Sequence, residues 1–166
     1  EINWSLQVKG NTPLVKTSQL RNSKNTKRLK PILSKQALII NPKKIDITGN
    51  NSIWDLRFTD GSSSKTSSAG AILLPLSNQP LLFKLNQKNN YLAELTAIYL
   101  AIYSSNSKHN LLIYTDSMSS LMAISNAYSS RYSRLTQKTG HHILLKLKEL
   151  LQARRGATVI DYIPSH

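Results

Sequence analysis

The sequence predicts an α/β fold in which a mixed five-stranded sheet carries helices on its faces. Two patterns predict it. Three strand-like segments follow one another between residues 53 and 85, and helical segments alternate with strand-like ones from residue 91 onward. Such an order is typical of helices packed on a mixed sheet.

The first three segments are expected to form an antiparallel meander. Residues 53–59 alternate apolar and polar side chains, as in a strand with one buried face. Residues 69–76 form an apolar run with a turn at Pro75, and residues 81–85 are short enough for a third strand. Serine-rich and asparagine-rich residues between and after these segments favour turns.

A buried helix is predicted over residues 91–103, with Asn89 or Asn90 as its N-cap. Between Leu92 and Ile102 only Glu94 and Thr96 are polar, and a helix that is apolar on nearly all sides is buried on most of them. We expect Glu94 in its first turn.

The remaining elements complete the alternation. A strand is predicted over residues 111–115, a helix over 118–128, a long helix over 141–155 and a last strand over 158–163. The long helix has one apolar face, with Lys146 and Lys148 outside it, and we expect Gly156 to end it. Its cations are interpreted equally well as a face that contacts phosphates or as a solvated face.

The charge of the chain indicates its partner. Its 166 residues carry a formal net charge of +14. Such an excess attracts polyanions, so nucleic acid is the expected partner and an anionic membrane surface the alternative. Up to Asp46 there are ten basic residues against Glu1 and Asp46. We therefore predict a basic linker or arm, partly disordered, over residues 1–48 and a globular domain over 49–166. The Lys24–Lys30 cluster is interpreted as part of a solvated linker rather than as a nuclear localisation signal.

Several other classes are excluded or disfavoured. No apolar run approaches the roughly 20 residues that span a bilayer, and the first residues do not resemble a signal peptide. An intracellular location, in the nucleus or the cytoplasm, is therefore expected. The absence of cysteine excludes disulfides and thiolate metal sites.

Three of the eight acidic residues stand out as a set. Taken singly, Asp60 is interpreted as part of an Asp-Gly turn and Asp116 as part of a helix N-cap. Glu94 is harder to explain structurally, because a carboxylate on an apolar helix needs a compensating cation or hydrogen bonds. If Asp60 and Asp116 close neighbouring strands, both emerge at one edge of the sheet, where the intervening helix can direct Glu94. Converging carboxylates favour Mg²⁺ or Mn²⁺, and two such ions roughly 4 Å apart are the standard device for phosphodiester cleavage.

The residues around these acids resemble a known family. The segments FTDGS at residues 58–62, YLAELTA at 91–97 and IYTDS at 113–117 resemble, in order, the signature blocks of type 1 ribonuclease H domains. The last residues, DYIPSH at 161–166, are similar to the final core strand and the Pro-x-His turn of that family. The similarity is greatest to the ribonuclease H domains of retrotransposon polyproteins, and it covers about residues 53–166.

The resemblance implies a ribonuclease H-like fold and endonucleolytic hydrolysis of RNA in RNA–DNA hybrids. It implies Asp60, Glu94 and Asp116 as catalytic metal ligands for Mg²⁺ or Mn²⁺, and His166 as a catalytic residue on a mobile loop. Candidate nucleic-acid contacts are Gly61, Ser62, Asn90 and Ser117. It also implies a reverse transcriptase domain in the same polyprotein as a partner.

One departure from the family pattern concerns a fourth carboxylate. The family carries an Asp in a C-terminal helix beyond the loop histidine, and this sequence has no such helix or acid after His166. We therefore expect a C-terminally incomplete domain that binds metal with impaired cleavage, because three carboxylates hold a second ion more weakly.

Two alternatives stay open. A nucleic-acid-binding module without catalysis would share the charge and the fold, but it would not need Glu94 on an apolar helix. The integrase and transposase branch of the same architecture places its Glu after both aspartates, whereas the order here is Asp, Glu, Asp. The order favours the ribonuclease.

Overall fold

The computed structural model describes residues 53–75, 77, 79–131, 134 and 138–164, together with the backbone of three short earlier strands at 4–7, 15–16 and 38–40. Most of the predicted arm, and with it the predicted boundary at residue 48, lies outside the described residues. No described helix has both the length and the apolar character needed to cross a membrane.

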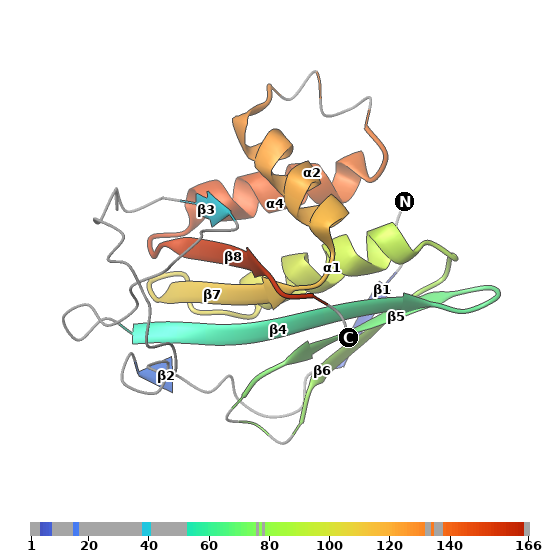
Figure 1. Cartoon of the computed structure of the whole chain (residues 1–166), viewed down its shortest axis with the longest axis horizontal. Helices are drawn as coiled ribbons and strands as arrows, with labels where there is room; N and C mark the ends of the chain where they lie inside the picture. The colour runs from blue at the N-terminus through green and yellow to red at the C-terminus, as the bar shows by residue number, and fades with distance from the viewer. Residues whose placement is uncertain are drawn as a thin grey trace.

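A mixed sheet forms the centre of the fold (Figure 1). Its five main strands are β4 (Ile53–Ser63), β5 (Ser68–Leu73), β6 (Leu81–Leu85), β7 (Asn110–Thr115) and β8 (Thr158–Tyr162). β4, β5 and β6 form the predicted antiparallel meander, while β7 pairs parallel with both β4 and β8. The predicted mixed five-stranded sheet is thus confirmed.

Three short strands from the first part of the chain extend this sheet. β1 (Trp4–Gln7) pairs antiparallel with β6, β2 (Val15–Lys16) pairs antiparallel with the start of β4, and β3 (Leu38–Ile40) pairs parallel with β8. Both edges of the five-stranded sheet are therefore lined by backbone from the basic N-terminal part of the chain.

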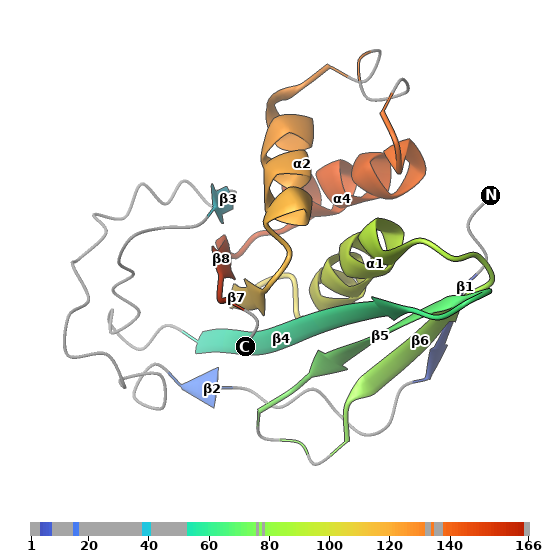
Figure 2. The same ribbon diagram turned by 45° about the vertical axis from the view of Figure 1, so that its right-hand side comes forward.

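The described helices α1 (Asn90–Tyr103), α2 (Met118–Ser129) and α4 (His141–Ala153) lie together on one face of the sheet (Figures 1 and 2). The Asn89 side chain caps α1 by accepting the Leu92 N–H at 3.1 Å. α1 is buried from Leu92 through Ile98, as its sequence predicted. Glu94 lies in the second turn of α1, since the helix begins at Asn90 and its first turn holds no acid.

The course of β4 corrects one prediction. Asp60 does not close this strand, because antiparallel pairing with β5 continues from Phe58 through Ser63, with Asp60 opposite Ala71. The parallel pairing with β7 does stop there, at the pair Thr59 and Thr115. Asp60 is thus the first residue of β4 that β7 no longer flanks.

The end of α4 corrects a second prediction from the sequence. The helix ends at Ala153, and Gly156 does not cap it in a left-handed conformation. Gly156 is instead required by close packing, because a Cβ there would lie 1.9 Å from the carbonyl oxygen of His109.

Lys148 and Arg154, predicted to face solvent or phosphate, are both buried. The Lys148 amine donates to the Ser130 carbonyl.

A buried ionic network lies at the start of β4. Asp55 and Arg57 are both fully buried, with 3.9 Å between the Asp55 Oδ2 and Arg57 Nη2 atoms. Arg154 is close by and donates to Thr158 Oγ1, Ser105 Oγ and the His109 carbonyl. Burial lowers the pKa of both arginines to about 10 against the opposing effect of Asp55. The Asp55 carboxylate therefore favours the charged form of two buried guanidinium groups in this part of the structure.

Candidate active site

Three carboxylates converge at the end of β7. Asp60 extends from β4, Asp116 follows the last residue of β7, and Glu94 projects from α1. One carboxylate oxygen from each lies within 4.8 Å of the others. The parallel register brings the two aspartates together, because the last paired residues of the two strands, Thr59 and Thr115, directly precede them. The structure thus brings together the three acids that the sequence singled out.

Gly61 permits the close approach of α1 to β4. A Cβ at this position would lie 2.7 Å from the backbone nitrogen of Glu94 and 2.8 Å from the carbonyl carbon of Ala93. Without a side chain, the Gly61 N–H reaches the Glu94 carboxylate as a hydrogen-bond donor. The Asp-Gly pair therefore acts through helix packing and not as the hairpin turn that it suggests in isolation.

The Glu94 carboxylate lies in an environment that disfavours its negative charge. Only 5% of the residue is exposed. Burial and then repulsion from Asp116 raise its pKa from 4.5 to about 7, with a smaller contribution from Asp60, while the Gly61 N–H acts in the opposite direction. The Glu94 Oε2 atom has no hydrogen-bond partner among the described residues. A buried carboxylate with one oxygen lacking a donor, close to two further carboxylates, is an environment that a hard divalent cation stabilises.

The residues predicted to contact nucleic acid lie within four residues of a cluster carboxylate in the chain. Ser62 is exposed beside Gly61, and Asn90 is exposed as the first residue of α1. Ser117 is half-buried and caps α2 by accepting the Ser120 N–H at 3.3 Å. His166 lies outside the described residues.

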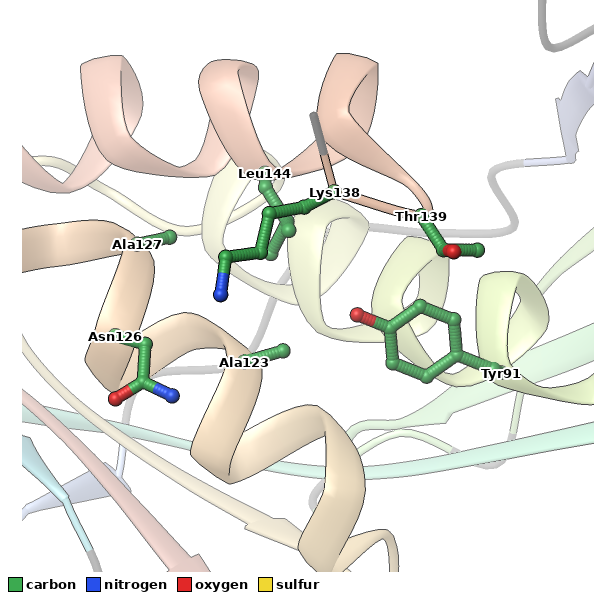
Figure 3. Close-up of a pocket in the computed structure, with 7 residues that line it drawn as sticks. All are labelled: Tyr91, Ala123, Asn126, Ala127, Lys138, Thr139 and Leu144. Atoms are coloured by element: carbon green, nitrogen blue, oxygen red, sulfur yellow. The ribbon is translucent and has the colours of Figure 1, made fainter. Parts of the chain in front are cut away.

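A pocket of about 210 Å³ lies between α1, α2 and the segment before α4, and it was not predicted from the sequence. Figure 3 shows that the Lys138 ammonium and the Tyr91 hydroxyl point toward the space between α1, α2 and the start of α4. It is lined by Tyr91, Ala123, Asn126, Ala127, Lys138, Thr139 and Leu144. Tyr91 lies three residues before Glu94, so the two side chains share one side of α1. A single lysine in a polar segment has no sequence signal that separates it from a solvated residue.

Comparison with known proteins agrees with this geometry. Residues 55–166 match the RNase H family, a range that spans all three carboxylates. A search of curated proteins gave no match to the chain.

Proposed function

The chain belongs to the RNase H family, and from that premise we propose that it hydrolyses the RNA strand of RNA–DNA hybrids endonucleolytically, with two metal ions held by Asp60, Glu94 and Asp116. The family supports hybrid ribonuclease activity and nucleic-acid binding in general. The observation that carries the specific proposal is the convergence of three carboxylates within 4.8 Å of one another, one of them the buried Glu94, whose Oε2 has no hydrogen-bond partner among the described residues.

The donor set fits Mg²⁺ or Mn²⁺. All three ligands are carboxylates, and hard oxygen donors suit these ions better than softer metals. When bound, the ions supply activation of the attacking water and charge stabilisation at the leaving 3′ oxygen. The protein's own contribution is to hold three mutually repelling carboxylates in place and, through α1, to shield Glu94 from water.

The cluster also suggests a limit on activity. Within the described residues it comprises three carboxylates, enough to hold one ion firmly and a second more weakly. We propose that cleavage by the 166-residue chain is impaired in Mg²⁺. Turnover at the full rate of the family in Mg²⁺ would contradict this part of the proposal.

The charge and the pocket support binding of the hybrid. A net charge of +14 favours a polyanion, and the wide minor groove of a hybrid is recognised mainly by its shape and 2′-hydroxyls. We propose Gly61, Ser62, Asn90 and Ser117 as contacts near the scissile phosphate. Lys138, in the pocket between α1 and α2, has the charge to contact a backbone phosphate.

Two further parts of the proposal rest on the resemblance to retrotransposon domains. His166 is proposed as a catalytic residue. A reverse transcriptase domain is proposed as a partner within one polyprotein.

Replacing Glu94 by Gln tests the catalytic role. We expect E94Q to lose cleavage of a labelled RNA–DNA hybrid while it retains binding of the same hybrid, because it removes one metal ligand but no cation. The matched control is Glu149→Gln, which changes an exposed glutamate on α4. If neither wild type nor E94Q cleaves and both bind equally, the chain is a nucleic-acid-binding module without catalysis.

A further inference from the structure

The turn that carries Asp116 is a single residue long. Thr115 ends β7 and Ser117 is the N-cap of α2, so Asp116 alone connects strand and helix. Thr115 is fully buried, and its Oγ1 atom accepts a hydrogen bond from the Ser117 N–H at 3.1 Å. The hydrogen bond of this hydroxyl therefore links the residue before Asp116 to the residue after it.

Both ends of the turn are fixed to neighbouring elements. On the strand side, the Thr115 carbonyl accepts the Ile163 N–H at 2.9 Å. On the helix side, Ser117 Oγ accepts the Ser120 N–H at 3.3 Å and lies 2.7 Å from the Ser120 hydroxyl. The Thr115 hydroxyl is the link that joins these two anchors across Asp116.

The turn must resist electrostatic repulsion before a cation arrives. One carboxylate oxygen of Asp116 lies within 4.8 Å of a carboxylate oxygen of the buried Glu94 and of Asp60, so their charges repel when no cation is bound. If the turn relaxed, Asp116 could move away from Glu94, and a cation would have to draw it back at the expense of its own binding free energy. A site held in the binding geometry in advance avoids that loss.

We propose that Thr115 is a positioning residue of the metal site, whose buried hydroxyl holds the turn that places Asp116 and so sets the affinity for the divalent cation. The inference rests on the proposed metal-dependent function. Thr115 itself contributes no ligand to the described cluster.

Thr158 provides a matched control. It is also a buried threonine in the sheet, and its Oγ1 accepts a hydrogen bond from Arg154 Nε at 3.0 Å. It lies at the start of β8, opposite Leu111 at the other end of β7 from Asp116. Replacing Thr158 by Val should therefore reduce stability without affecting the metal site.

The experiment is calorimetric titration of Mn²⁺ into the metal-free 166-residue chain, with thermal unfolding in chelator measured alongside. We expect T115V to bind Mn²⁺ about tenfold more weakly than wild type, and T115S to stay within about twofold, because only the valine leaves the Ser117 N–H unsatisfied. T158V should unfold at a lower temperature yet bind Mn²⁺ like wild type. The Mg²⁺ concentration for half-maximal cleavage should rise in T115V by the same factor as the Mn²⁺ dissociation constant.

The possible results distinguish the positioning role of Thr115 from the proposed metal-dependent function. Wild-type affinity in T115V, or an equal loss in T158V, overturns the positioning role and leaves the proposed function intact. A wild-type chain that binds no Mn²⁺ overturns the proposed function and this inference together. If T115V does not fold, the pair T115S and T115A isolates the same hydroxyl, and equal Mn²⁺ affinity in those two variants overturns the inference.

Discussion

Glu94 should make the metal-free protein less stable as the pH rises. Its carboxyl keeps a proton up to a pKa of about 7 in the folded state, whereas the ordinary value of 4.5 applies once the chain unfolds. Between these values the folded state binds more protons than the unfolded state, so stability falls with increasing pH. The stabilisation is complete below about 4.5 and lost as the pH passes through 7.

The size of the effect follows from the shift. One pKa unit corresponds to about 1.4 kcal/mol, so a shift from 4.5 to about 7 sets an upper bound of about 3.5 kcal/mol at pH 8. Replacing Glu94 by Gln removes the charge and keeps the shape of the protonated acid. We expect E94Q to match wild type near pH 4.5 and to be about 2–3 kcal/mol more stable at pH 8.

The assay is urea unfolding in chelator at several pH values between 4.5 and 8. The exposed Glu149→Gln serves as control, with an expected change within about 0.5 kcal/mol throughout. Saturating Mg²⁺ should reduce the pH dependence of wild type but not alter E94Q, because a cation stabilises the ionised carboxylate. The reasoning is refuted if E94Q is no more stable than wild type at pH 8 without metal.

The remaining predictions concern packing and the pocket. In the buried ionic network, D55N should cost about 3–5 kcal/mol in urea unfolding because it leaves the buried Arg57 guanidinium without its carboxylate; wild-type stability in D55N would contradict this. G61A should cost about 1–3 kcal/mol and weaken Mn²⁺ binding, because its Cβ would displace α1 at Glu94; unchanged Mn²⁺ affinity in a folded G61A would contradict this. K138Q should weaken hybrid binding and lower the slope of log K against log salt by about 0.9, with K138R close to wild type and Mn²⁺ affinity unaltered; equal slopes for wild type and K138Q would exclude a phosphate contact.

The alternation of helices and strands was predictable because the apolar residues of each segment recur at the spacing typical of its secondary structure. Residues 81–85 form a strand with the predicted bounds, and the apolar face of residues 91–103 is buried as expected. The meeting of the three acids was predictable for the same reason. The parallel pairing of β4 and β7 stops at Thr59 and Thr115, so the two following aspartates emerge together, and a charged residue of the buried helix packed there has little other environment.

What the sequence did not predict depends on contacts between distant segments. The continuation of β4 past Asp60 follows from pairing with β5, which no local pattern around an Asp-Gly pair reveals. The burial of Arg154 depends on acceptors supplied by Ser105 and His109, far from it in the chain. The pocket likewise combines side chains from α1, α2, α4 and the segment before α4.

The most direct test of the central claim is cleavage of an RNA–DNA hybrid labelled on its RNA strand, with wild type and D116N compared in Mg²⁺ and in Mn²⁺. We expect wild type to cut the RNA strand internally only when one of these ions is present, and to cut neither single-stranded RNA nor duplex DNA. D116N should bind the hybrid and leave it intact. Hybrid bound by wild type but uncut in both ions, or cut equally by D116N, would contradict the assignment of these carboxylates as a ribonuclease site.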